Sequence, residues 1–326
     1  MIIVRSPLRI SLGGGGTDLP SYYTNHGGFF LAGAIDKYVY ASINRPFSPG
    51  IYLKYSKVEQ VSSINSIQHP IIRESLRYFS LNTPQIEITT LADIPAGTGL
   101  GSSGSFATAL LKALHVHYRR SISSGDLAEL ACKVEIDQLL EPIGKQDQYI
   151  SVVGGLTCFT VSNDGSVAHK SLNVSTQVIH DLEDNLLLFF TGSTRSAGSI
   201  LVDQNNQTVK GSTRIIENLH SIKQIGLQSC EALISGNTSL FGELMNQHWH
   251  LKKDRSSIMT NELIDVAYKT AIKNGATGGK IVGAGGGGFL MFYAHDKEKL
   301  RHAMEKIGLP EIRFKFDFEG TKVILS

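Results

Sequence analysis

The hydrophobic positions of the chain follow two periods, one typical of strands and one typical of helices. Strand-like runs cover residues 2–4, 8–12 and 29–44. Asp36 and Lys37 interrupt the last of these runs, and we expect a turn or a bulge there. The amino-terminal part of the chain is therefore predicted to begin with long strands.

An alternating run at residues 85–90 leads through a glycine-rich loop into a helical pattern at residues 102–118. This order predicts a strand, a loop and a helix. Later elements are expected as helices at 124–139, 213–234, 240–253 and 261–273, and as strands at 149–159, 186–190, 280–282 and 289–293. A polar, serine-rich stretch near residues 160–180 separates two halves, so we expect domains at residues 1–170 and 171–326.

Length and composition agree with a two-domain globular protein. The chain has 326 residues, of which 41% are hydrophobic and 18% charged. A formal charge of +2 lacks the basic surplus of nucleic-acid-binding proteins. The amino terminus does not read as a signal peptide, and no apolar run is long enough for a membrane helix. We therefore expect a cytoplasmic protein without nucleic-acid or membrane partners.

The three cysteines are Cys132, Cys158 and Cys230, an odd number at wide spacing. This pattern indicates neither a disulfide framework nor a structural zinc site. Cys132 and Cys158 lie in apolar patterns, so we expect them to be thiols in the core of a protein from a reducing compartment.

Glycine is clustered in three blocks at junctions between elements. We call residues 13–16, 97–104 and 283–288 the first, second and third glycine blocks. The second block precedes a helix, whose first backbone N–H groups lack partners within the helix and can bind an anion. No lysine follows at the position that a Walker A motif requires. A dinucleotide fingerprint also fits its glycine spacing, but Asp126 begins another helix instead of following a second parallel strand.

Hydroxyl and carboxylate side chains near the second block point to phosphate and magnesium chemistry. Ser102 and Ser103 stand in the first turn of the predicted helix, where they could contact a phosphate or Mg²⁺. Glu135 and Asp147 are the best-placed carboxylates for completing such a site. Each of these residues also has an interpretation without a ligand. Glu135 could lie on a solvated helix face, Asp147 could be a turn residue, and the glycines could simply form the entry to a helix.

Three segments carry a resemblance to the GHMP small-molecule kinases. They are PLRISLGGGGTD at residues 7–18, PAGTGLGSSG at 95–104 and KIVGAGGGG at 280–288, and they occur in the family's order. The resemblance spans the whole chain. It implies an α+β fold with two domains, a ribosomal protein S5 domain 2-like amino-terminal domain and a ferredoxin-like carboxy-terminal domain, with the active site between them.

The resemblance also assigns roles to residues. The ATP phosphates would be held by Gly97, Thr98, Gly99, Leu100, Gly101, Ser102 and Ser103. Ser103 and Glu135 would hold Mg²⁺, and Asp147 would be the catalytic base, oriented and kept ionised by Arg9. Thr17 and Asp18 would bind sugar hydroxyls, and Gly286 in the third block would lie near the acceptor. One departure is Gly104, where many relatives have alanine, and we expect this change to loosen only the helix start.

A narrower similarity, to kinases of D-glycero-D-manno-heptose 7-phosphate, lies in residues 13–23 and 34–40. It implies ATP-dependent phosphorylation of the anomeric hydroxyl of that sugar phosphate, for activated-heptose and surface-glycan synthesis. Arg195 is our candidate for binding the phosphate that the acceptor already carries. The alternatives are fucose, galactose or another small alcohol as acceptor, or a non-catalytic sensor of sugar and ATP on the same fold.

Several other charged residues receive a plainer interpretation. Lys252, Lys253 and Arg255 are expected at a solvated helix end, and the histidine pairs around residues 115–117 and 248–250 are not expected to bind metal. The oligomeric state, with a homodimer as one option, and the anomeric preference stay open.

Overall fold

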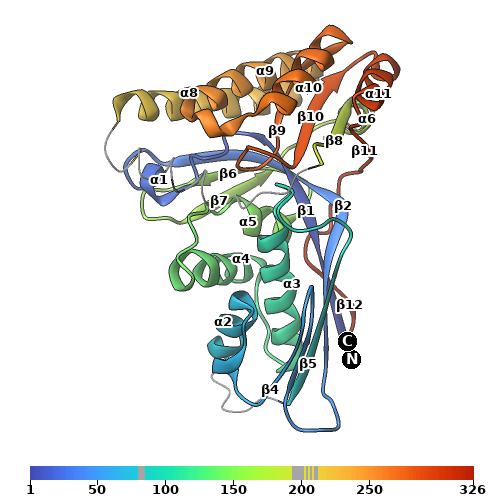
Figure 1. Ribbon diagram of the computed structural model, residues 1–326. Helices are drawn as coiled ribbons and strands as arrows, with labels where there is room; N and C mark the ends of the chain where they lie inside the picture. Colours follow the sequence, from blue (N-terminus) through green and yellow to red (C-terminus); the bar gives the residue numbers. More distant parts are fainter. Residues whose placement is uncertain (80–84, 193–201, 203–204, 206–207, 209–211) are drawn as a thin grey trace.

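The computed structural model describes residues 1–79, 85–192, 202, 205, 208 and 212–326, which form two units (Figure 1). Within these residues, one unit is built on an eight-stranded sheet and the other on a four-stranded sheet. Helices pack on both sheets. This mixed architecture confirms the expected α+β class with two sheet-based units.

Two long neighbouring strands organise the first sheet. β1 covers Ile2–Gly13 and pairs antiparallel along its length with β2, which covers Gly28–Asn44. The register shifts opposite Asp36 and Lys37, so the expected bulge is confirmed. The sheet order is β12-β1-β2-β5-β3-β4, with β6 paired to β2 and β7 to β6. The other strands are β3 Ile51–Lys54, β4 Val58–Val61, β5 Ile86–Ala92, β6 Leu156–Val161, β7 Val167–Ser171 and β12 Lys322–Leu325.

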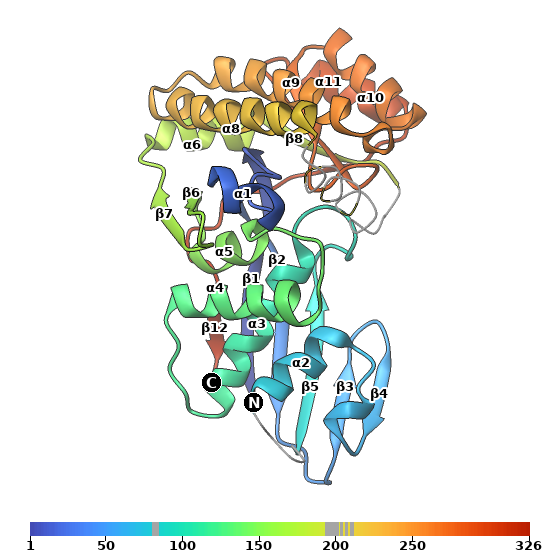
Figure 2. The same ribbon diagram turned by 90° about the vertical axis from the view of Figure 1, so that its left-hand side faces the viewer.

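Three helices of the first unit lie together beside this sheet (Figures 1 and 2). α3 (Ser102–His117) and α5 (Gln146–Val153) contact β1 and β2, and α4 (Ser124–Cys132) packs against both helices. α4 continues into a π-helical segment, Lys133–Gln138. The other helices of this unit are α1 Pro20–His26, α2 Pro70–Tyr78 and a 3₁₀ turn at Ile64–Ser66.

The second unit carries the strand order β11-β8-β10-β9, with every pair antiparallel. Its own core includes Phe189, Trp249 and Phe292. α8 contacts α9 and also β1 and β2, so it joins the second unit to the first. The elements are α6 Thr176–Asn185, β8 Leu186–Phe190, α8 Thr213–Ile234, α9 Thr238–Arg255, a 3₁₀ turn at Ser257–Met259, α10 Glu262–Lys273, β9 Ala276–Ile281, β10 Phe289–Ala294, α11 Lys297–Lys306 and β11 Glu311–Ile312.

One predicted strand is wrong at its start. The run at residues 149–159 is expected to be a strand, but its first part is the end of α5 and only β6 is extended. A short apolar run that is buried on all sides has no period that separates helix from strand. Gly154 and Gly155, both with positive φ, end the helix and turn the chain into β6.

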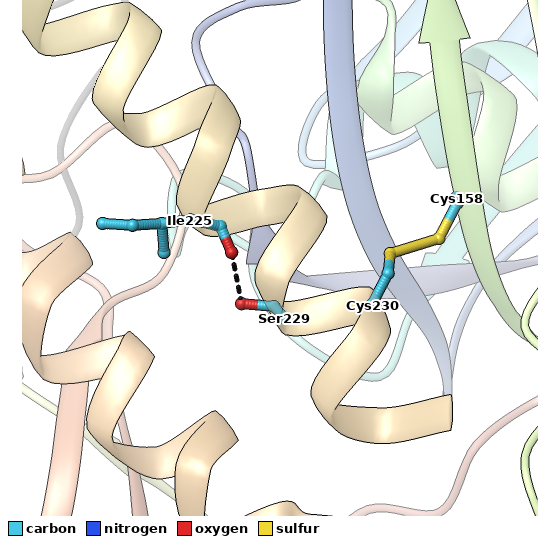
Figure 3. The surroundings of a disulfide bond; sticks show 4 residues. All are labelled: Cys158, Ile225, Ser229 and Cys230. Carbon is cyan, nitrogen blue, oxygen red and sulfur yellow. Dashed lines mark hydrogen bonds between the residues drawn. A yellow bond between two sulfur atoms is a disulfide. The ribbon is translucent and has the colours of Figure 1, made fainter. Parts of the chain in front are cut away.

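The cysteines differ from expectation in one respect. Cys132 is a buried free thiol, as expected. Cys158 on β6, however, forms a disulfide with Cys230 on α8, which corrects its assignment as a core thiol (Figure 3). Ser229 beside it donates a hydrogen bond of 2.8 Å to the Ile225 carbonyl within α8. The two cysteines are 72 residues apart, and only the tertiary fold brings them together.

No helix among the described residues is both long and apolar enough to cross a membrane. The two chain ends lie close together at the far end of the first sheet, where β12 pairs with β1 (Figure 1).

Candidate active site

All three glycine blocks meet at one cavity of about 720 Å³. Its lining includes residues of the first unit, such as Arg9, Asp18 and Asp147, and residues of the second unit, such as Lys280 and Gly283. The cavity therefore lies where the two units meet, and it gathers the motifs that the sequence separates by more than 250 residues.

The second glycine block forms the entrance to α3. Gly97, Gly99, Gly101, Ser102 and Ser103 line the cavity. Gly101, with a φ of 77°, is the residue before α3, and within the described residues no side chain caps this helix end. The first N–H groups of a sixteen-residue helix thus face the cavity, with the helix dipole adding positive potential.

Two members of the expected phosphate loop serve the fold instead. Thr98 and Leu100 are almost fully buried and are absent from the cavity wall. The Thr98 hydroxyl donates to the Pro95 carbonyl at 3.1 Å, and the Leu100 carbonyl accepts from Arg9 N at 2.9 Å. Their side chains shape the loop, so a ligand in the cavity would meet the glycines and serines.

The third glycine block presses directly on the second. A Cβ at Gly99 would lie 2.5 Å from the Val282 carbonyl oxygen, and one at Gly283 would lie 2.6 Å from the Gly99 oxygen. Both residues also have positive φ. Glycine is needed at both positions because any side chain would separate the two units at the cavity.

Arg9 and Asp147 form an ion pair at the cavity wall. Arg9 Nε lies 2.8 Å from Asp147 Oδ1, and Arg9 Nη1 donates to the Gly99 carbonyl at 2.5 Å. The Asp147 side chain is 25% exposed, so a ligand can reach its carboxylate, while Arg9 is buried. Arg9 thus ties the aspartate to the second glycine block.

Gly104 lies against this aspartate, which corrects the expectation that it affects only the start of α3. A Cβ at Gly104 would lie 2.8 Å from Asp147 Cβ and 3.0 Å from the Gln148 backbone nitrogen. Such a distance is too short for van der Waals contact, so a larger residue would displace α5 from α3. The bare glycine sets how closely Asp147 approaches the helix end.

Glu135 points into the protein, because the π-helical segment changes the angular spacing after α4. It is 1% exposed, which excludes the solvated helix face. Gln148 Nε2 donates to its carboxylate at 2.6 Å, and the Ser103 hydroxyl also donates to it. Burial raises the pKa of Glu135 to about 7, against the lowering effect of these two hydrogen bonds.

Glu135 and Ser103 fit a magnesium site of the kind that phosphate ligands complete. Among the described residues, no three His, Cys, Asp or Glu side chains form a metal cluster. Mg²⁺ bound with nucleotide phosphates, however, commonly takes only one or two protein ligands. A buried carboxylate with a raised pKa beside a hydroxyl, at a helix entrance suited to phosphate, has the right donor chemistry.

The expected sugar-binding residues divide into two groups. Asp18 lines the cavity, where its carboxylate accepts from Gly16 N and Gln146 N, both at 3.0 Å. Burial raises its pKa, against these backbone donors. The Asp18 carboxylate lies so close to Gly144 that a Cβ on Gly144 would be 2.0 Å from Asp18 Oδ2.

Thr17 and Gly286 do not line the cavity, in contrast to their expected roles. The fully buried Thr17 hydroxyl lies 2.8 Å from the Gly14 carbonyl oxygen and 2.7 Å from that of Phe29. Gly286 N donates to the Met259 carbonyl at 2.9 Å. Both residues hold loops in place. Arg195, the candidate for the acceptor phosphate, lies outside the described residues.

The cavity lining also includes four basic side chains, which we call the basic wall: His248, Lys252 and Arg255 on α9, and Lys280 on β9. All four are buried. The expected solvated helix end is therefore wrong for Lys252 and Arg255. A signal was available, because Met245, Trp249 and Lys252 follow at helical spacing and share the buried face.

Burial and mutual repulsion act on the basic wall. The pKa of Lys280 is lowered to about 7 by burial, with Arg9 and Arg255 contributing. Burial lowers the pKa of Arg255 to about 10. The pKa values of Lys252 and His248 are lowered well below their usual ranges, again chiefly by burial. A wall of this kind attracts negative charge.

The cavity thus combines an anion-binding helix end, a carboxylate that an arginine orients, a buried acid suited to a divalent cation and a basic wall. Phosphoryl transfer needs these components: donors for phosphate oxygens, a proton acceptor and neutralisation of charge.

Two family models match the chain. The model described as GHMP kinases N terminal domain covers residues 67–155, and the one described as GHMP kinases C terminal covers residues 229–308. The first includes the second glycine block with Glu135 and Asp147, and the second includes the basic wall and the third glycine block.

Two of the relatives that match over almost the whole chain are sugar kinases. The chain is 29% identical to D-glycero-alpha-D-manno-heptose 7-phosphate kinase from Campylobacter jejuni, over 98% of each protein. It is 25% identical to galactokinase from Pyrococcus furiosus, over 100% of this chain and 97% of the relative. The crystal structure of a D-glycero-D-manno-heptose 1-phosphate kinase from Bacteroides thetaiotaomicron matches with a TM-score of 0.83 and 25% identity, over 100% of this chain and 99% of that one.

Proposed function

Because the chain belongs to the GHMP kinase family and is a sugar kinase, we propose that it phosphorylates the anomeric hydroxyl of D-glycero-D-manno-heptose 7-phosphate. The product would be the 1,7-bisphosphate, an intermediate for nucleotide-activated heptose and surface glycans. The similarity to the Campylobacter jejuni kinase over 98% of the chain supports this acceptor. The observation that carries the chemistry is the Arg9–Asp147 pair beside the open end of α3 in one cavity.

The reaction follows from these positions. The acceptor hydroxyl attacks the γ-phosphorus of ATP, a new P–O bond forms, and the bond from the γ-phosphorus to the bridging oxygen breaks to release ADP. Asp147 accepts the hydroxyl proton, and Arg9 holds the carboxylate in place. The amides at the start of α3 and the glycines of the second block bind phosphate oxygens as charge spreads over them.

Mg²⁺ is part of the proposal. Ser103 and Glu135 would hold it, and when bound it would neutralise charge on the nucleotide phosphates. Gln148 keeps the Glu135 carboxylate oriented through its 2.6 Å hydrogen bond. Asp18 would bind sugar hydroxyls with the acceptor capacity that its two backbone donors leave.

Coupled measurement of ADP release with a panel of acceptors tests this function. The panel should contain heptose 7-phosphate, its 1-phosphate isomer, unphosphorylated heptose, galactose and fucose. We expect the highest kcat/KM for the 7-phosphate, with phosphorus NMR placing the new group on the anomeric oxygen. A higher kcat/KM for galactose or fucose would replace the acceptor, and nucleotide binding without any turnover would favour the sensor.

A further inference from the structure

The basic wall is larger than the phosphoryl-transfer chemistry requires. Arg9 already serves the catalytic aspartate, and the end of α3 already supplies donors for the nucleotide phosphates. His248, Lys252, Arg255 and Lys280 are additional, and all four line the cavity. Buried cations are rare in proteins unless something pairs with them.

Within the described part of the chain, the hydrogen-bond partners of the Lys252 and Lys280 ammonium groups are all neutral. Lys280 Nζ donates to the Leu12 carbonyl at 3.0 Å and lies 3.2 Å from His248 Nδ1. Lys252 Nζ donates to the Ile281 carbonyl at 3.2 Å and to that of Gly283. None of the ion pairs between described residues includes either lysine. Two ammonium groups are thus held by carbonyls beside a cavity, an arrangement suited to receiving an anion.

The position of Lys280 separates it from the nucleotide end of the cavity. Along β1, Arg9 contacts the second glycine block, whereas Leu12, the partner of Lys280, lies three residues further toward the first block. Three residues of extended strand span roughly 10 Å. Lys280 therefore lies on the side of Arg9 that leads to Asp18, where the sugar is proposed to bind.

We propose that Lys252 and Lys280, together with Arg255, bind the phosphate group that the sugar acceptor already carries. This inference rests on the proposed function and gives its acceptor phosphate a location. The acceptor would span the cavity, with its reacting hydroxyl at Asp147 and its phosphate at the basic wall. The wall would then select phosphorylated over unphosphorylated sugars, because a phosphate of the substrate would neutralise two lysines whose hydrogen-bond partners among the described residues are neutral.

Lys280→Met and Lys252→Met test this role, and Lys253→Met is the matched control. Lys253 is the neighbour of Lys252 on α9, but its Nζ lies 5.6 Å from the centre of the Trp249 ring, and it does not line the cavity. Each variant should first be shown to be folded by thermal unfolding. Methionine keeps the length of the apolar stem, so we expect both cavity variants to be at least as stable as the original protein.

For each variant, KM for heptose 7-phosphate and for ATP is measured separately, with unphosphorylated heptose as a second acceptor. We expect KM for the sugar phosphate to rise about 10- to 100-fold, the effect of losing a charged hydrogen bond. KM for ATP and kcat/KM for unphosphorylated heptose should stay within about threefold, as should all constants of Lys253→Met. An unchanged KM for the sugar phosphate, or a rise confined to ATP, would overturn the assignment.

The same measurements separate this inference from the proposed function. If another sugar phosphate proves to be the acceptor, the heptose identity fails, but the two variants should still lose affinity for that phosphate selectively. If the original protein prefers heptose 7-phosphate and the variants bind it normally, only the basic wall assignment fails. A preference of the original protein for unphosphorylated sugars would overturn the inference as well.

Discussion

The two sides of the cavity differ in charge and in how they are built. One side, which we call the acidic wall, consists of Ser103, Glu135 and Asp147 around the end of α3. The basic wall is supplied by α9 and β9. Ser103 and Asp147 stand in the first turns of α3 and α5, and Glu135 stands in the π-helical segment after α4. The basic wall comes mainly from the buried face of α9. Residues for bond-making chemistry therefore stand in recognisable motifs, but residues that accommodate substrate charge can be hidden within ordinary amphipathic patterns.

The largest effect is expected from Asp147→Asn on the acidic wall. Asparagine keeps the shape and can still accept from Arg9, but it cannot take the proton of the acceptor. We expect kcat to fall by about 10²- to 10⁴-fold, the usual contribution of a general base, with thermal unfolding unchanged. Single-turnover measurement of ADP formation checks this. A kcat within about threefold of the original would remove Asp147 from the role.

Glu135→Gln should have the next largest effect. Glutamine preserves contact with Gln148 and Ser103 but loses the charge, so we expect the Mg²⁺ concentration for half-maximal activity to rise by about 10- to 100-fold. The control is Asp137→Asn, which removes an exposed acid two residues away in the same π-helical segment. Identical magnesium titrations for the two variants would contradict a role for Glu135 in holding the ion.

Gly104→Ala tests the packing between α3 and Asp147. The added Cβ would need α5 to shift, and we expect kcat to fall on the order of tenfold, less than the roughly 100-fold cost of a 1 Å displacement. Gly125→Ala on α4 is the control, since its Cβ would meet nothing within 4 Å. That control should gain up to about 1 kcal/mol of unfolding free energy. Equal kcat values for both variants would show that Gly104 does not set the position of the base.

The smallest expected effect is a pH dependence of the unfolding free energy that arises from Lys280 on the basic wall. The pKa of Lys280 is lowered to about 7 in the folded protein, so above pH 7 the folded chain releases a proton that the unfolded chain retains. The destabilising effect of this burial is complete below the folded pKa of about 7 and fades as the pH rises toward the unfolded pKa. Between the two pKa values the unfolded chain binds more protons than the folded chain, so the unfolding free energy rises with pH, by at most about 1.4 kcal/mol per pH unit. Arg9, His248, Lys252 and Arg255 face the same group and remain in Lys280→Met.

Urea unfolding of both proteins at pH 7, 8 and 9 measures this difference. We expect the unfolding free energy of the original protein to increase relative to Lys280→Met over this range. Parallel pH profiles would mean that Lys280 keeps its proton in the folded chain, and that burial leaves its pKa near the ordinary value for a lysine.

The sequence predicts the place of Ser103 well, because the second glycine block and the first turn of α3 are neighbours along the chain. The start of α3 and the bulge at Asp36 and Lys37 are likewise local features, and both predictions are confirmed. The helices at 213–234 and 261–273 are confirmed within one residue, because they have one buried face and a clear period.

Other features depend on contacts that no local pattern contains. The π-helical turn that buries Glu135, the Cys158–Cys230 disulfide and the internal role of the Thr17 hydroxyl arise from tertiary packing. The charge of Lys252 favours solvent, whereas its spacing from Trp249 favours the apolar face of α9. The spacing is the better guide in this case, because a cavity makes the buried position tolerable for a cation.

The pairing of β12 with β1 has a practical consequence for dividing this chain. Residues 322–325 are the last strand, yet they complete the sheet of the first unit, and the Asp317 backbone nitrogen also donates to the Ala34 carbonyl at 2.9 Å. A fragment that ends at residue 170 would leave the outer hydrogen-bonding edge of β1 open to other molecules. Expression of the first unit by itself would thus require the terminal segment to be grafted back, for example by circular permutation across the neighbouring chain ends.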